Sequence, residues 1–282
     1  MTSIAEALRY AHDTLAESGV ADPRRESVSL LAHALERDKT FLYAHPEYGL
    51  ADEEKELFAS YLQRRASREP YQYITGVQEF YGLEFEVTPD VLIPRPETEM
   101  VVEQAVKVLA GNTAPSFCEI GVGSGCISVS ILHELLAATA VAVDVSPGAL
   151  KVTRRNAERL GVGDRLTLIE SNVFEALAGN TFDSIVSNPP YVPVSDFAEL
   201  QPEVRDFEPQ GALTDGVDGL SIIRRIVSES PRFLRRGGYL LMEIGLDQSA
   251  QVAAMFDEEV WETPDLLPDL QGIPRVVSTR IK

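Results

Sequence analysis

Apolar residues along the first 75 positions recur at intervals of three and four, the spacing that places them on one face of a helix. The stripes comprise Ile4, Leu8, Ala11 and Leu15; Val28, Leu31 and Leu35; and Leu57 with Tyr61. No strand-like alternation separates these stripes. The pattern predicts a small all-helical domain at residues 1–75, in which the apolar faces pack on one another.

Local signals place the ends of the first two helices. Ser3 and Glu6 have the spacing of a capping box, and Gly19 follows the first apolar stripe. Asp22 and Pro23 supply a cap residue and a first-turn proline for the second helix. We therefore expect the first helix to close at Gly19 and the second to begin at Pro23.

The pattern changes after the helical segment. From position 79 apolar and polar residues alternate until three prolines interrupt, which predicts a β-hairpin connector over residues 76–96. Residues 97–282 alternate short apolar runs with helical stretches, the order of an α/β domain with parallel strands and crossover helices. The predicted strands are 116–121, 140–144, 165–170, 182–187, 238–244 and 275–280, and the predicted helices are 97–109, 126–136, 147–160 and 220–234.

Composition and charge narrow the class of protein. Of 282 residues, 44% are hydrophobic and 24% charged, as in a globular protein, and the formal net charge is −19. A chain this acidic is a poor general binder of phosphate backbones and anionic membranes. We therefore expect neither a nucleic-acid nor a membrane partner. Cys118 and Cys126 lack the spacing of a disulfide framework or zinc site, and the N-terminus lacks an apolar signal core. We expect a cytoplasmic protein without a metal.

A glycine-rich turn lies between a predicted strand and a predicted helix. Its sequence is Glu119-Ile120-Gly121-Val122-Gly123-Ser124-Gly125. Glycines at such a turn let the backbone approach a ligand closely, and the next helix offers N–H groups to electron-rich atoms. Cys126 stands where the dinucleotide fingerprint has its last glycine, so a nucleotide-type ligand other than NAD or FAD is favoured.

The second strand of the predicted sheet ends in Asp144. A carboxylate about 20 residues beyond the glycine turn is placed to accept hydrogen bonds from ribose hydroxyls. The glycine turn and Asp144 therefore both indicate the same nucleotide-type ligand. The alternative is structural: the glycines form a tight turn, and Asp144 caps the helix that begins near Pro147.

A second motif, Asn188-Pro189-Pro190-Tyr191, follows another apolar strand at the edge where open parallel sheets bind ligands. The prolines stiffen the turn and leave the Pro189 carbonyl and the Asn188 carboxamide oxygen to accept hydrogen bonds. This pair suits a planar NH₂ group, against which Tyr191 can lie. Holding both hydrogens primes the nitrogen for in-line attack on a methyl group. The alternative is an ordinary proline turn with Asn188 as a cap.

Together these motifs resemble those of class I S-adenosylmethionine-dependent methyltransferases, and in particular the HemK/PrmC family of release factor glutamine N5-methyltransferases. The likeness runs nearly end to end, through 22–24, 64–76, 79–83, 92–99, 188–191 and 272–277. It implies a Rossmann-like methyltransferase sheet over residues 97–282. It also implies S-adenosyl-L-methionine as cofactor and, as substrate, the glutamine of the Gly-Gly-Gln motif in class I peptide chain release factors.

The resemblance also implies roles for individual residues. Residues expected at the cofactor are Glu119, Ile120, Gly121, Val122, Gly123, Asp144, Asn172, Val173 and Asn188. Residues expected at the substrate are Asn188, Pro189, Pro190, Tyr191, Phe80, Pro94, Arg95 and Glu99, with Asn188, Pro189 and Tyr191 as the catalytic group. Two positions depart from the family pattern. Glu119 stands where Asp is common, and Val173 cannot stack on adenine as an aromatic residue would.

Three other functions stay open from the sequence. The substrate amide could belong to a ribosomal protein, the NH₂ group to adenine or guanine in a nucleic acid, or the chain could be a catalytically silent scaffold. The acidic charge argues against a nucleic acid, although arginine clusters at 64–68, 154–155 and 232–236 keep that option open. We expect a monomer. We also expect the helical domain to recognise the body of the release factor, because one glutamine fills little of an interface of roughly 1,600 Å².

Overall fold

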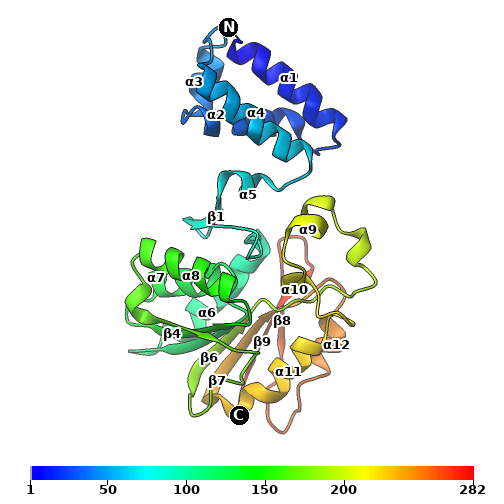
Figure 1. The fold of residues 1–282 in the computed structure, drawn as a ribbon. Helices are drawn as coiled ribbons and strands as arrows, with labels where there is room; N and C mark the ends of the chain where they lie inside the picture. Colours follow the sequence, from blue (N-terminus) through cyan, green and yellow to red (C-terminus); the bar gives the residue numbers. More distant parts are fainter. Residues whose placement is uncertain (1) are drawn as a thin grey trace. The chain divides into compact units, whose positions relative to one another are not determined.

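The computed structural model describes residues 2–282, which form two compact units. The first contains the chain up to Val77 together with Gln201–Phe207, and the second contains Gln78–Leu200 and Glu208–Lys282. The segment Gln201–Phe207 therefore groups with the N-terminal helices, although its position in the sequence assigns it to the domain predicted at 97–282. Figure 1 shows the elements of both units.

Helices are the main elements of the first unit over residues 2–76 and 201–207, and an isolated bridge joins Ser3 and Gly49. Its elements are α1 (Ile4–Glu17), α2 (Pro23–Ala34), α3 (Lys39–Ala44), α4 (Asp52–Ala66), α5 (Tyr71–Thr75) and α9 (Pro202–Phe207). The predicted capping box is confirmed, because Ser3 and Glu6 bond to each other's backbone N–H groups. Asp22 caps α2, with Pro23 in its first turn. The predicted stripes of α1 and α2 pack into one core, with Ile4, Leu15 and Leu31 fully buried. In α4 the core residues are Phe58 and Leu62; the predicted Leu57 is 41% exposed, so the stripe of this helix lies one position further along than expected.

An ion-pair cluster holds the distant segment in the first unit. Glu203 of α9 accepts hydrogen bonds from Arg65 Nη2 at 2.9 Å and from Arg68 Nε at 2.7 Å. Arg65, which is 4% exposed, also pairs with Glu26 of α2. Although burial opposes it, bonding to the two arginines holds the pKa of Glu203 down at about 2. The cluster thus joins α2, α4 and α9.

The second unit opens with a two-stranded hairpin and continues as a seven-stranded sheet. The hairpin consists of β1 (Val77–Phe80) and β2 (Leu83–Glu86). The sheet strands are β3 (Ser116–Ile120), β4 (Thr139–Asp144), β5 (Leu166–Glu170), β6 (Phe182–Ser187), β7 (Leu234–Glu243), β8 (Asp265–Pro268) and β9 (Pro274–Arg280). Their order is β5-β4-β3-β6-β7-β9-β8, with β9 antiparallel to both neighbours and the other pairs parallel.

Helices cover both faces of this sheet (Figure 1). One face packs on α6 (Glu99–Leu109), α7 (Cys126–Glu134) and α8 (Pro147–Arg159), and the other on α11 (Ser221–Glu229) and α12 (Ser249–Ala253). Side chains of one strand alternate between the two cores, as Leu240, Leu241 and Met242 do along β7. The predicted α/β class is confirmed, and each predicted strand is present with ends shifted by at most a few residues.

Some elements differ from the sequence-based expectation. The helix predicted at 220–234 ends at Glu229, because Pro231 lies in a separate turn, η4 (Ser230–Arg232), and Leu234 already belongs to β7. The strand β8 and the short helices α9, α10 (Gln210–Leu213) and α12 have too few residues to show a period. Among residues 2–282, no helix has the length and apolar character needed to span a membrane.

Candidate active site

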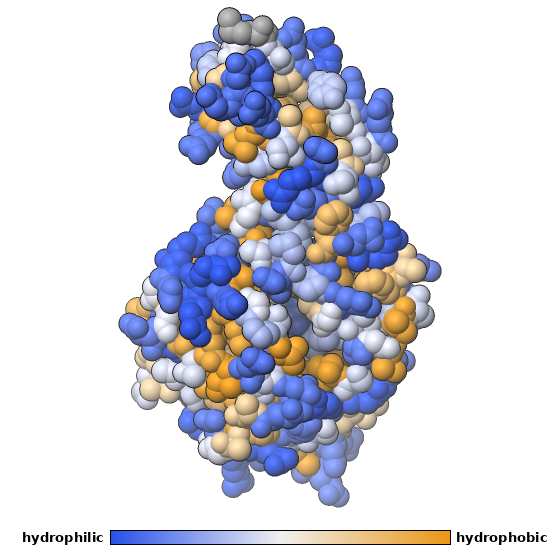
Figure 2. Space-filling view, viewed as in Figure 1, coloured by the Kyte–Doolittle hydropathy of each residue, from blue (hydrophilic) through white to orange (hydrophobic). Residues whose placement is uncertain are grey.

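Strands β3, β4 and β6 end at the same edge of the sheet, and the loops that follow them surround a cavity of about 490 Å³. Figure 2 shows a hollow in this part of the surface, with hydrophobic and polar side chains around it. The predicted site residues that line the cavity are Glu119, Ile120, Gly121, Val122, Gly123, Asp144, Asn172, Val173, Asn188, Pro190, Pro94 and Arg95. Such a volume is in the range of small-molecule sites.

The glycine turn leaves room for a ligand. Gly121 and Gly123 have φ values of +75° and +55°, and a Cβ built on either one would meet nothing within 4 Å. Their N–H groups are already bonded within the protein, that of Gly121 to the Val143 carbonyl and that of Gly123 to Asp144. The turn therefore provides close backbone approach, while its own N–H groups hold it in shape.

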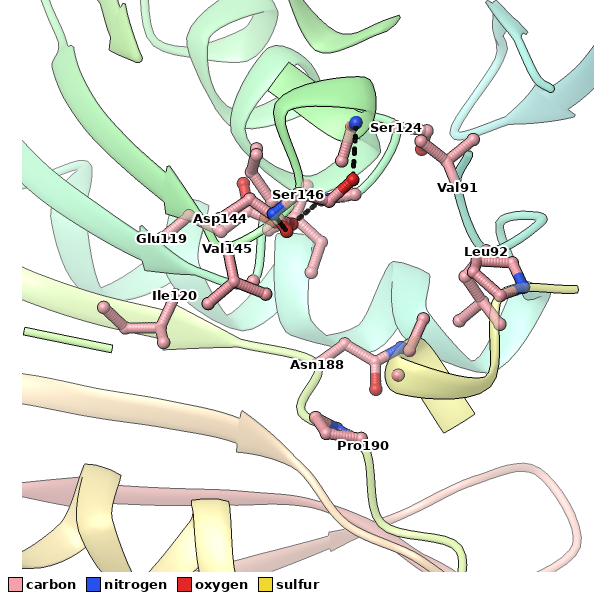
Figure 3. Close-up of a pocket in the computed structure, with 18 of the residues that line it drawn as sticks. Val91, Leu92, Glu119, Ile120, Ser124, Asp144, Val145, Ser146, Asn188 and Pro190 are labelled. Atoms are coloured by element: carbon pink, nitrogen blue, oxygen red, sulfur yellow. Dashed lines mark hydrogen bonds between the residues drawn. The ribbon is translucent and has the colours of Figure 1, made fainter. Parts of the chain in front are cut away.

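Asp144 connects two loops at the end of β4. Its Oδ2 accepts from the Gly123 N–H at 3.0 Å and its Oδ1 from the Ser146 N–H at 2.9 Å. Ser146, and not Asp144, caps α8 by accepting from the Ala149 N–H. The structural alternative for Asp144 as a helix cap is therefore wrong. Burial raises the pKa of this carboxyl group, which lines the cavity beside Ser146, as Figure 3 shows.

Glu119 is almost fully buried at the end of β3, where it accepts hydrogen bonds from the backbone and side chain of Ser128 in α7. Burial raises its pKa to about 8, although the two bonds from Ser128 oppose the rise. The folded protein therefore binds more protons than the unfolded chain between pH 4.5 and 8. The contribution of the Glu119 carboxyl group to the free energy of unfolding is complete below pH 4.5 and is lost as the pH rises through 8.

This shift predicts a pH dependence of folding. Between pH 6 and 8 the free energy of unfolding should decrease by about 1 kcal/mol per pH unit through Glu119. The Glu119→Gln variant should lose this slope, which urea denaturation at each pH would measure. Glu170→Gln, at the exposed end of β5, is the control and should keep it. Equal slopes in Glu119→Gln and the unmodified protein would contradict the assignment.

Asn188 begins the loop after β6 and lies at the cavity between the strand ends of Ile120 and Val145 and the segment of Leu92 (Figure 3). Its Nδ2 donates to Thr98 Oγ1 at 3.1 Å. The strand end beneath it is fixed, because the Ser187 hydroxyl donates to the Ile120 carbonyl at 2.8 Å. Asn188 therefore has one end of its carboxamide bound to protein and the oxygen left for a ligand.

Tyr191 does not line the cavity. Its hydroxyl donates to Glu243 Oε1 at 2.9 Å, and its carbonyl accepts from Gln248 Nε2 at 2.9 Å. Burial and the nearby Glu243 carboxylate raise the pKa of the phenol well above its usual range. The Tyr191 hydroxyl thus reaches back to the end of β7, and the contact of its ring with the substrate stays a prediction.

Residues 208–215 form a wall of the cavity that the sequence did not reveal. Buried Glu208 accepts from the Ile93 N–H at 3.1 Å and pairs with Arg95. Asp215 accepts from the N–H groups of Val217, Gly219 and Ser221. Side-chain and backbone donors hold the pKa of Asp215 at about 2, although burial opposes the shift. These two carboxylates fix the wall on either side of α10.

At the position expected to bind adenine, the carboxamide of Asn172 is hydrogen-bonded within the protein. Asn172 Nδ2 donates to Glu175 at 2.8 Å and its Oδ1 accepts from Arg225 at 2.9 Å. Val173 is 5% exposed, has a φ of +55° and packs in the core below the cavity. Apolar contact at this end can come from Val145 and Ile222, which also line the cavity.

Two residues expected beside the substrate have other roles in the structure. Phe80 is buried in the core with Phe85 and lies outside the cavity lining. Glu99 also lies outside it, and its carboxylate accepts from the Tyr81 N–H at 2.8 Å, which fixes the hairpin turn on α6. Phe80 was expected at the substrate only from the resemblance; its place in the alternating segment agrees with its burial. Pro189 is buried next to the lining residues.

Comparisons with known proteins agree with this geometry. The family model of the PrmC N-terminal domain matches residues 6–76, and that of the methyltransferase small domain matches residues 99–199. A release factor glutamine methyltransferase of Geobacter sulfurreducens is 45% identical over 279 residues, 99% of this chain and 97% of the relative.

Solved structures share the fold. A methyltransferase of Pyrococcus furiosus has a TM-score of 0.53 at 17% identity and covers 72% of this chain and 90% of its own. The 16S rRNA N2 G1207 methyltransferase of T. thermophilus, solved with AdoMet and guanosine, has a TM-score of 0.51 at 18% identity, covering 73% of this chain and 50% of its own. With the identity over the full length, these findings show that the chain belongs to the family of release factor glutamine methyltransferases.

Proposed function

We propose that this protein transfers a methyl group from S-adenosyl-L-methionine to the side-chain amide nitrogen, N5, of the glutamine in the Gly-Gly-Gln motif of class I peptide chain release factors. One observation carries the proposal. Asn188, whose carboxamide oxygen is left for a ligand, lines the same cavity as the open glycine turn and Asp144. Methyl donor and amide acceptor can therefore meet in one enclosed space.

The residues around the cavity fit the cofactor. Gly121 and Gly123 form a cradle that any side chain would fill, and the Asp144 carboxylate stands at the adjoining strand end. Asp90 adds an acidic group to the lining, which suits a ligand that carries positive charge. When bound, S-adenosyl-L-methionine supplies an electrophilic methyl group on a sulfonium centre.

Asn188 and Pro189 provide the chemistry that the protein itself contributes. The Asn188 Oδ1 and the Pro189 carbonyl accept the two hydrogens of the substrate NH₂ group. This fixes the plane of the amide and raises electron density on its nitrogen. Pro190, Leu92 and Pro94 give the cavity apolar walls that exclude water from the reacting atoms.

The direct test offers several substrates to the unmodified protein. Unmethylated release factor, a ribosomal protein and DNA are each incubated with S-adenosyl-L-methionine, and mass spectrometry locates any added methyl group. The expected result is one methyl group on the Gly-Gly-Gln glutamine of the release factor. Methylation of the ribosomal protein or of DNA alone would overturn the assigned substrate, and the absence of transfer to all three would overturn the activity.

The helical unit is proposed to dock the body of the release factor. It exposes two large aromatic side chains, Tyr10 at 68% and Tyr43 at 64%, a residue type that often anchors interfaces. Replacing both by serine should raise KM for the whole factor about 10-fold and leave KM for a Gly-Gly-Gln peptide unchanged. Leu136→Ser, at an exposed site of the second unit, is the control. Equal effects on factor and peptide would refute the docking role.

A further inference from the structure

Behind Asn188 lies a chain of hydrogen-bonded side chains, of which Thr98 also lines the cavity. Thr98, at the start of α6, and Glu243, at the end of β7, are each 2% exposed. The Thr98 hydroxyl lies 2.6 Å from Glu243 Oε2 and 3.1 Å from Asn188 Nδ2. The other carboxylate oxygen, Oε1, accepts from Tyr191 at 2.9 Å. Glu243 therefore connects both ends of the Asn188–Tyr191 turn.

The direction of each hydrogen bond follows from the chemistry of the groups. Thr98 donates its single hydroxyl proton to Glu243 Oε2. The Thr98 oxygen can then only accept from Asn188, which requires the NH₂ side of the carboxamide to face Thr98. As a result the oxygen of Asn188 faces the other way, toward the ligand.

We propose that Glu243 is a positioning residue that, through the Thr98 hydroxyl, holds the Asn188 carboxamide with its oxygen presented to the substrate amide. The proposal rests on the proposed function, in which that oxygen accepts a hydrogen of the glutamine NH₂ group. Through its bond to Tyr191, Glu243 also anchors the far side of the turn.

Packing alone gives no reason for a carboxylate at this position. Among residues 2–282, no Lys, Arg or His nitrogen forms an ion pair with Glu243. Burial raises the pKa of this carboxyl group, and an apolar side chain of similar shape would avoid the cost of burying it. The gain from Glu243 is that it offers one oxygen to Thr98 and the other to Tyr191, whereas an amide has a single oxygen.

The Glu243→Gln variant keeps the shape of the side chain and changes its hydrogen-bond donors and acceptors. In Glu243→Gln the new NH₂ group can donate to Thr98, which frees the Thr98 proton for the Asn188 oxygen. The carboxamide of Asn188 can then turn over and present its own NH₂ group to the substrate NH₂, where two donors oppose each other. Because the side chain keeps its size, the fold should be retained.

Kinetics of four full-length variants test this relay. Glu243→Gln and Thr98→Val should each lower kcat about 10- to 100-fold, the effect of misplacing a catalytic contact. Thr98→Ser keeps the hydroxyl and should retain near-normal kcat. The double variant Glu243→Gln/Thr98→Val should be no slower than the slower single variant, because both changes break one chain of bonds. Additive losses, or a Thr98→Ser variant as slow as Thr98→Val, would overturn the proposal.

A second measurement needs neither cofactor nor substrate. The side-chain NH₂ resonance of Asn188, assigned by its loss in Asn188→Asp, should shift in Glu243→Gln and in Thr98→Val but not in Thr98→Ser. Thermal unfolding midpoints confirm that each variant is folded. An unchanged resonance in both Glu243→Gln and Thr98→Val overturns the relay. If instead the resonances shift as expected while the unmodified protein methylates no release factor, the relay stands and the proposed function fails.

Discussion

Replacing Asn188 with alanine is expected to lower kcat on release factor by about 10²-fold or more. The side chain lines the cavity with one end of its carboxamide fixed on Thr98, so its oxygen is oriented before the substrate arrives. Removing one preorganised hydrogen-bonding group of this kind typically costs about 10²- to 10³-fold in kcat. Steady-state methylation of the purified factor measures the loss.

The control for Asn188→Ala is Asn180→Ala. Asn180 is exposed in a loop before β6, where its side chain donates only to the Leu177 carbonyl. Its replacement should leave kcat unchanged. Cofactor affinity, measured by calorimetry, shows whether the Asn188 variant still binds S-adenosyl-L-methionine. If that affinity is intact and methylation is near normal, Asn188 does not have the proposed role.

Gly219→Ala should be the most damaging change outside the catalytic motif. Gly219 has a φ of +73°, and a Cβ at this position would lie 2.1 Å from the carbonyl oxygen of Tyr191. The contact is with backbone, so the turn that carries Asn188 to Tyr191 must move by an ångström or so. A displacement of this size at catalytic groups can lower kcat about 10²-fold.

Gly216→Ala supplies a matched comparison within the same loop. Gly216 has a φ of +78°, nearly that of Gly219, but its Cβ would meet nothing within 4 Å. Both variants therefore bear the strain of an L-residue in the left-handed region, and only Gly219→Ala adds the clash. We expect Gly216→Ala to lose some thermal stability and to keep most of its kcat. Equal kcat values for the two variants would show that the Tyr191 carbonyl tolerates displacement.

Much of the fold follows from local patterns in the sequence. The apolar stripes and the Ser3–Glu6 capping box describe the helical unit, because both depend on residues within one turn of each other. Strands such as β3 and β6 are buried on both faces and therefore appear as short apolar runs. The membership of α9 in the helical unit has no such local signal, since it depends on Glu203 meeting arginines 135 and 138 positions earlier.

The candidate site divides in a similar way. Motifs that follow a strand, at Gly121, Asp144 and Asn188, were predictable because strand ends meet at one edge of the sheet. Glu243 gave the same signal, a carboxylate at the end of an apolar strand, and that signal could have identified it. Glu208 and Asp215 follow no strand, and their function arises only from the backbone N–H groups they meet.

The arrangement of α9 has a consequence for synthesis of the chain. Arg65 and Arg68 emerge from the ribosome long before Glu203, and the helical unit lacks this part of its structure until residue 207 has been made. By then β3 to β6 have already been translated. The N-terminal helices therefore cannot reach their final state as an early, independent folding event, and a contact of high sequence separation completes them late. If the two segments were expressed separately, the N-terminal helices would lack Glu203, and α9 would lack Arg65 and Arg68.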